Sequence, residues 1–272
     1  LNSGRNALTG VGIATAALAA GGYVTADSAL VESWNGSNWT EVNDLAQNRR
    51  SSGAAGTYTA SIVFAGIKPG DTVVSLTESW NGSNWTEVND LGTARRGCGG
   101  NGTNTAALCS GGNTYPGGNI DSVESWNGTN WTEVNDLNSV RNDTTAIGTN
   151  TAALCFGGAP AGYGRTELWN GTNWTEVNDL NTNRQSAGGA GTSTSGLGFG
   201  GFAPPPGNQT ANAESWNGTN WTEENNLNTA RGSLAGAGTS SSALGFGGSP
   251  QLSATELWTG AGAGLTRTFT DS

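Results

Sequence analysis

The chain has 272 residues, 21 acidic and 11 basic side chains and no histidine, which gives a formal net charge of −10. This charge argues against nucleic acid as a partner, because phosphate backbones are repelled by acidic proteins. No apolar run reaches the roughly 18 residues of a membrane-spanning helix, so we expect no membrane insertion. The 45 glycines and 11 tryptophans favour a folded protein that is rich in strands and turns.

A repeated phrase dominates the sequence. Glu-Ser-Trp-Asn-Gly-Ser-Asn-Trp-Thr-Glu-Val-Asn-Asp-Leu begins at Glu32 and again at Glu78. Near copies begin at Glu124, Glu167 and Glu214, and a shortened copy begins at Glu256. The copies lie 42 to 47 residues apart. A period of this length indicates one supersecondary unit per copy, stacked against its neighbours.

Three further markers recur with the phrase. A second tryptophan occurs at Trp39, Trp85, Trp131, Trp174 and Trp221, with Ala263 in the sixth copy. An arginine precedes each unit, at Arg5, Arg49, Arg95, Arg141, Arg184 and Arg231. A Gly-Gly pair occurs at residues 21–22, 111–112, 157–158, 200–201 and 247–248, with Ala65-Gly66 in the second copy.

Each unit reads as four short strands, in chain order a, b, c and d. Strand a follows the arginine, as in residues 186–191, and strand b ends at the Gly-Gly pair, as in 151–156. Strand c ends at the first tryptophan, as in 123–126, and strand d begins at the second, as in 131–137. The Asn-Gly between c and d is a strong hairpin signal because both residues tolerate positive φ.

Six such units predict an all-β, six-bladed propeller with four antiparallel strands per blade, forming a single domain over residues 1–272. A four-stranded unit cannot cover both of its faces alone, and packing around a ring covers them. We expect the glycine- and alanine-rich strands a and b nearest the axis and the paired tryptophans farther out. The blades are predicted at approximately 1–45, 46–91, 92–137, 138–180, 181–227 and 228–272.

An arginine, then Gly-Gly, then an acidic residue before an aromatic one, then a tryptophan in the last strand resembles the kelch pattern. The resemblance covers nearly the whole chain. It departs in that strand c ends in Trp rather than the more usual Tyr and in that the copies are unusually alike. The near-identical units also resemble those of kelch-like structural proteins of marine tailed phages, particularly cyanophages. That resemblance implies a virion-associated or cell-surface adhesive role.

Residues 1–5 match residues 137–141 in the middle of the chain, and the first residue is not Met. We therefore expect a piece of a longer polypeptide or a processed one. Each blade is then built from contiguous chain, and we expect closure to rest on the first strand a and the last strand d.

The repeated arginines and the glutamates before tryptophan (Glu32, Glu78, Glu124, Glu167, Glu214 and Glu256) allow two interpretations. They line a funnel for anionic ligands, or each arginine pairs with a carboxylate or caps carbonyls in its own blade. Strict recurrence favours the structural interpretation, because a functional site usually breaks symmetry.

Little in the sequence points to catalysis. Galactose oxidase, a kelch-like enzyme, needs two histidines for copper, and this chain has none. A sialidase Asp-box is matched only faintly by residues 33–39, which are one residue short and lack the Asp. Asn and Asp clusters are better explained as turns and caps than as calcium ligands. We expect no enzymatic activity, no cofactor and no metal.

Three cysteines, Cys98, Cys109 and Cys155, are too few for a disulfide scaffold. Cys98 and Cys109 flank a predicted hairpin symmetrically, where they can face each other. We expect free thiols.

The b–c loops differ in every copy, at residues 23–29, 67–75, 113–121, 159–165, 202–212 and 249–254. In kelch-like propellers they share one face with the d–a loops. The candidate binding residues on this face are Tyr23, Lys68, Tyr115, Tyr163, Arg165 and Phe202. Variable loops on a rigid scaffold are the usual place for binding, and neutral drift is the alternative.

The sequence therefore predicts a non-enzymatic structural or adhesive propeller of a phage particle. Its b–c face would bind a neighbouring virion protein or a host-surface glycan, and the chain would belong to a larger assembly. The alternative is a free extracellular bacterial lectin. The expected location is the virion or the extracellular space.

Overall fold

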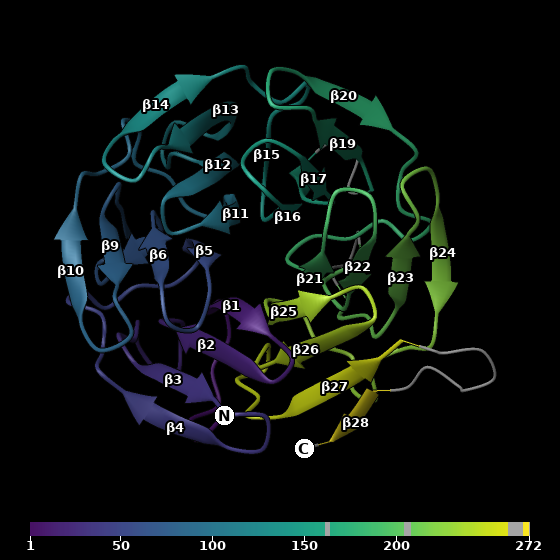
Figure 1. The fold of residues 1–272 in the computed structure, drawn as a ribbon, viewed down its shortest axis with the longest axis horizontal. Helices are drawn as coiled ribbons and strands as arrows, with labels where there is room; N and C mark the ends of the chain where they lie inside the picture. The colour runs from purple at the N-terminus through teal and green to yellow at the C-terminus, as the bar shows by residue number, and fades with distance from the viewer. Residues whose placement is uncertain (161–163, 204–207, 261–268, 272) are drawn as a thin grey trace.

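The computed structural model describes residues 1–160, 164–203, 208–260 and 269–271. Six four-stranded antiparallel sheets stand around a central axis (Figure 1). This confirms the predicted six-bladed, all-β propeller. None of these described residues is helical, so none forms a helix that could span a membrane.

Every blade is built from contiguous chain and runs a, b, c, d from the axis to the rim. Strands a are β1 (Thr9–Ile13), β5 (Gly53–Gly56), β11 (Gly99–Thr103), β16 (Thr145–Gly148), β21 (Gly188–Gly191) and β25 (Ala235–Thr239). Strands b are β2 (Ala16–Ala20), β6 (Ser61–Phe64), β12 (Ala106–Asn113), β17 (Ala153–Phe156), β22 (Gly196–Phe199) and β26 (Ser242–Phe246). Strands c are β3 (Val31–Trp34), β9 (Thr77–Trp80), β13 (Asn119–Trp126), β19 (Thr166–Trp169), β23 (Ala213–Trp216) and β27 (Thr255–Thr259). Strands d are β4 (Trp39–Val42), β10 (Trp85–Val88), β14 (Trp131–Val134), β20 (Trp174–Val177), β24 (Trp221–Glu224) and β28 (Phe269–Asp271).

The strand ends differ from the predicted ones for local reasons. Strand β21 begins after Ser186 because Ser186 has a left-handed backbone with φ of 53°. Strand β14 ends at Val134 because Asp136 turns back and accepts a hydrogen bond from the Val123 N–H at 3.2 Å. Short pairs at the b–c end, which the sequence did not predict, are β7 (Ile67–Lys68) with β8 (Thr72–Val73) and β15 (Arg141–Asn142) with β18 (Ala159–Pro160).

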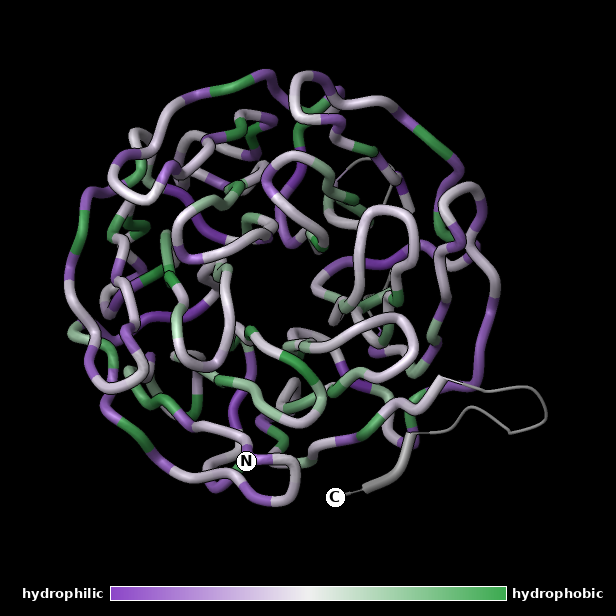
Figure 2. Tube along the Cα trace, viewed as in Figure 1, coloured by the Kyte–Doolittle hydropathy of each residue, from purple (hydrophilic) through white to green (hydrophobic). Residues whose placement is uncertain are grey.

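Close approach explains why the inner strands contain so much glycine. A Cβ on Gly236 would lie 2.5 Å from the carbonyl oxygen of Gly189 in the neighbouring blade. On the outermost strands, hydrophilic residues alternate with hydrophobic ones (Figure 2). There Thr40 and Glu41 are exposed. Charge on an open strand edge discourages pairing with another chain.

Paired tryptophans form the outer core. In five blades the two indole rings pack at a tilt, with centroids 5.2 to 5.4 Å apart. The first tryptophan also fixes the a–b turn: Trp126 Nε1 donates to the Asn104 carbonyl at 3.0 Å, and the other blades repeat this bond. Each blade is thereby tied across its own width.

The second tryptophan contacts the preceding blade. Trp131 Nε1 donates to Thr77 Oγ1 at 3.1 Å, and its ring centroid lies 4.8 Å from that of Phe64. Trp221 bonds Thr166 in the same way at 3.1 Å. This residue therefore joins neighbouring blades by apolar packing, and in four of the five cases also by one hydrogen bond.

The repeated arginines and glutamates form six buried ion pairs. All six arginines are fully buried and the glutamates are at most 4% exposed. In the third blade Arg95 Nη2 lies 2.7 Å from Glu124 Oε1, and Arg95 Nη1 donates to the Ser122 carbonyl at 2.6 Å. Glu124 Oε2 accepts the Gly92 N–H at 2.7 Å. The pairs are Arg5–Glu32, Arg49–Glu78, Arg95–Glu124, Arg141–Glu167, Arg184–Glu214 and Arg231–Glu256.

The same arginines also hold the preceding blade through their backbone. The N–H of Gly22 donates to the Arg49 carbonyl at 2.9 Å, and the Gly248 N–H donates to the Arg5 carbonyl at 2.9 Å. The second of these bonds joins the sixth blade to the first. Each crossover from rim to axis is thus fixed to two blades at once.

A closed ring of backbone hydrogen bonds surrounds the axis just before strands a. We call it the axial ring, and its residues are Ala7, Ser51, Gly97, Asp143, Ser186 and Ser233. Each N–H donates to the carbonyl of the ring residue in the preceding blade, at 2.7 to 2.9 Å. All six have positive φ, between 51° and 60°. This left-handed backbone is disfavoured for most residues, so the surrounding contacts must hold it.

Closure of the propeller follows from this ring. The Ala7 N–H donates to the Ser233 carbonyl at 2.9 Å, and β1 packs against β25. The Arg5 N–H also bonds the Leu252 carbonyl at 3.3 Å. The first strand a therefore meets the last strand a, where we had expected it to meet the last strand d.

Trp174 differs from the other second tryptophans in its hydrogen bonding. Its Nε1 is buried without a hydrogen-bond partner, because the position of Thr77 and Thr166 is occupied by Val123 in the blade that it contacts. Val123→Thr offers the missing acceptor.

The matched control is Val31→Thr, since Trp85 above it already donates to the Asn43 carbonyl. We expect Val31→Thr to lower the free energy of unfolding by about 1–2 kcal/mol more than Val123→Thr, in urea titrations. Equal losses would contradict this assignment.

Candidate functional site

An axial channel opens at the end of the propeller where the b–c loops lie. The d–a crossovers lie at the same end, because they are joined to the b–c loops by isolated β-bridges, as between Asn6 and Tyr23 and between Arg50 and Ile67. The mouth at this end is a cavity of about 150 Å³. A second cavity, of about 120 Å³, continues toward the a–b turns. Both cavities are lined by Gly10, Ala54, Gly100, Ala146, Gly189 and Gly236.

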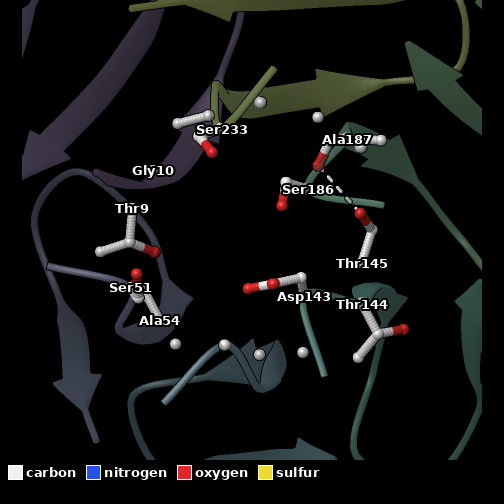
Figure 3. Close-up of a pocket in the computed structure, with 18 of the residues that line it drawn as sticks. Thr9, Gly10, Ser51, Ala54, Asp143, Thr144, Thr145, Ser186, Ala187 and Ser233 are labelled. Carbon is white, nitrogen blue, oxygen red and sulfur yellow. Dashed lines mark hydrogen bonds between the residues drawn. The ribbon is translucent and has the colours of Figure 1, made fainter. Parts of the chain in front are cut away.

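The axial ring forms the wall of the mouth, and one of its side chains is a carboxylate. Asp143 points toward the middle of the cavity, as do the hydroxyls of Ser186 and Ser233, and Ser51 lies at the opposite wall (Figure 3). The Asp143 carboxylate makes no hydrogen bond or ion pair with any residue that the structure describes. Thr145, by contrast, is engaged, since its hydroxyl donates to the Ala187 carbonyl at 2.8 Å.

The protein environment disfavours the charged form of Asp143. Burial raises the pKa of Asp143, and the positive charge of Arg96 opposes this effect. Apart from the Cys98 thiol, the other lining side chains are small groups that do not ionise. The mouth therefore presents one poorly solvated carboxylate among hydroxyls.

A cluster of charged residues lies beside the mouth between the first two blades. Arg50 pairs with Asp27 and, at 2.7 Å, with Asp71. Its guanidinium also lies 5.4 Å from the centroid of the Tyr23 ring. The predicted binding residue Tyr23 is thus half-buried and stacked on Arg50 rather than free.

The other predicted binding residues are spread over several blades. Tyr115 is 67% exposed at the tip of the β12–β13 hairpin. Lys68 is half-buried in β7, and Phe202 lies against Gly232. Arg165 donates to Ser139 Oγ at 2.6 Å. Tyr163 lies outside the described residues. The structure does not bring these side chains together into one pocket.

Sequence reasoning missed Asp143, although a signal was present. The axial ring residues all stand two positions after a repeated arginine, and Asp143 is the one among them that carries a charge. An alignment of the six repeats identifies Asp143 as the charged residue at this position. The positive φ that places it in the channel was not readable from the sequence.

The chemistry of the described residues is limited. Cys98, Cys109 and Cys155 are buried free thiols. Burial raises the pKa of Cys155, which keeps that thiol protonated. No group of three His, Cys, Asp or Glu side chains within the described ranges is placed to hold a metal ion.

Comparisons with known proteins show the fold alone. No family model matches the chain, and no curated protein matches it. It is similar to the solved structure described as "Structure of YjhT", with a TM-score of 0.81 and 12% sequence identity. That match covers 98% of this chain and 97% of the other.

The burial of Asp143 predicts a pH-dependent stability difference. Because its folded pKa is raised, the native state binds this proton more tightly than the unfolded state does. The resulting stability is present below the unfolded pKa of about 3.9 and is lost as the pH rises through the folded pKa. We expect Asp143→Asn to be more stable than the wild type at pH 7 and to lose this advantage near pH 4.

Urea titrations at several pH values measure this difference. Glu133→Gln, which removes an exposed carboxylate from the rim, is the control and should change stability little. An Asp143→Asn protein that is less stable than the wild type at pH 7 would contradict the account.

Proposed function

We propose that this propeller is a non-enzymatic binding module that contacts its partner through the b–c face. One observation carries the proposal: the sixfold symmetry of the molecule is broken at this end. The six b–c loops differ in length and composition, and the axial ring carries a single carboxylate there. A partner that binds one orientation of a sixfold ring needs such an asymmetry.

At the opposite end, the c–d turns of the first five blades are alike. In the first blade Asn35 Oδ1 accepts the N–H groups of Ser37 and Asn38 at 2.9 and 2.8 Å. The next four c–d turns repeat these bonds. This repetition is explained by turn geometry alone, and these five turns do not distinguish one blade from another.

The mouth supports binding better than catalysis. Glycoside hydrolysis ordinarily uses a pair of carboxylates, and the described lining of the mouth has one, Asp143. The chain has no histidine to act as a general base at neutral pH. A rigid ring with small polar groups and variable loops fits recognition.

More specifically, we propose that this binding module is a kelch-like structural protein of a phage particle and is located in the virion. The near-identical repeated units support it, through their resemblance to such proteins. The partner is then another virion protein, and the propeller is one part of a larger assembly. The alternative is an extracellular lectin, which the exposed Tyr115 favours because aromatic rings stack on sugars.

Two exposed tyrosines at opposite ends of the molecule give a matched test. Tyr115 lies on the b–c face, and Tyr58, 44% exposed, lies at an a–b turn. We expect Tyr115→Ala to weaken attachment to the particle at least about tenfold, and Tyr58→Ala to leave it unchanged.

The measurement is mass spectrometry of gradient-banded particles that carry each variant, with peptides from the b–c loops as reporters. Absence of the wild-type protein from particles would reject the virion proposal. Glycan-array binding that Tyr115→Ala abolishes would then establish the lectin. Equal behaviour of the two variants in both assays would reject the b–c face.

A further inference from the structure

The axial mouth contains an unpaired charge. Asp143 is partly buried, its carboxylate points into the cavity, and it has no hydrogen-bonding or ion-pairing partner among the described residues. Partial desolvation disfavours the charged form of this carboxylate, and no protein group compensates it with a hydrogen bond. A group that enters the cavity and satisfies the carboxylate recovers this cost.

The residues that line the mouth indicate which chemical group fits there. A single carboxylate attracts a cation, the hydroxyl of Ser186 lies on the same side of the mouth, and the hydroxyls of Ser51 and Ser233 offer further acceptors from the rest of the wall. A calcium ion takes six to eight oxygen ligands, commonly several carboxylates, which one aspartate does not supply. A primary ammonium has a single positive charge and three N–H donors, and it matches one carboxylate with neighbouring hydroxyls.

Size and charge point to the same ligand. The cavity of about 150 Å³ admits a slender chain that ends in a compact ammonium group. Arg96 is the charged neighbour of Asp143, and its field weakens the attraction without supplying an ion pair. Across the whole chain the net charge of −10 attracts basic partners.

We propose that the axial mouth binds a primary ammonium group, namely a lysine side chain of the partner protein, on the carboxylate of Asp143. This inference rests on the proposed function, because the mouth opens at the centre of the b–c face. The lysine side chain lies along the axis, and its ammonium donates to Asp143 and to the serine hydroxyls. The surrounding loops supply the rest of the contact.

The test uses the isolated protein and a lysine mimic. Nα-acetyl-lysinamide is titrated at pH 7.5 and low salt, followed by thermal unfolding and by ligand-observed NMR. We expect a dissociation constant of about 1 mM, typical of a small fragment. At ten times that concentration the midpoint of unfolding rises by about 2–5 °C.

Chemical and genetic controls separate the site from general charge effects. The Nε-acetylated form of the same compound lacks the charge and should not bind. Asp143→Asn keeps a residue that tolerates positive φ and should bind at least about tenfold more weakly. Glu133→Gln removes the same charge from the exposed rim and should bind like the wild type.

Arg96→Gln provides a second, independent variant. It removes the positive field at Asp143, so we expect severalfold tighter binding of the lysine mimic. No binding to the wild type or to Arg96→Gln would overturn the proposal. Equal binding to Asp143→Asn would also overturn it, as would tighter binding of spermidine, which would assign the mouth to free polyamines.

Failure of this inference is distinguishable from failure of the proposed function. The titration needs no partner, whereas the particle assay needs no small ligand. If the lysine mimic does not bind but the protein still attaches normally to particles, the axial ammonium site is rejected and the b–c face remains the proposed binding surface.

Discussion

The buried arginine at the start of each blade is the residue on which the rest of the structure depends. Its guanidinium pairs with a glutamate of its own blade, while its carbonyl accepts an N–H from the preceding blade, as Arg49 does with Glu78 and Gly22. The glutamate also holds the N–H of Ala46 in the crossover at 2.7 Å. Two charges buried together are costly unless they are well hydrogen-bonded. Arg49 donates to the Leu76 carbonyl and to Glu78, and its Nε alone is buried without a partner. This arrangement fixes where each crossover reaches the axis.

Because the crossovers are fixed, their backbones meet around the axis and form the axial ring. The ring residues in turn form the wall of the mouth. Two residues beyond each arginine the backbone is held at positive φ, and the six peptide groups bond to one another in a circle. A circle of equivalent positions has no weak seam, which is why β1 and β25 close the propeller without an exchanged strand. The same geometry turns the side chain of Asp143 into the channel, where it has no ion-pairing partner among the described residues.

The repeat could be predicted from the sequence because its signals are local and recur six times. The order of strands, the tryptophan hairpins and the small inner residues all follow from this pattern. The candidate site could not be predicted in the same way. Tyr23 looked available and is stacked on Arg50, because a cation in the next blade's crossover reaches it. Asp143 was not identified as a site residue, since its place in the cavity depends on a backbone circle that only the assembled ring creates.

Amide hydrogen exchange at the six ring residues tests the central claim most directly. If the axial ring is one closed unit, its six N–H groups should exchange equally slowly, and only through global unfolding. The Ala7 N–H, which bonds across the junction of the last and first blades, should be as protected as that of Gly97. Much faster exchange at Ala7 and its blade-one neighbours than at Gly97 would show that the junction opens by itself, and would contradict the account.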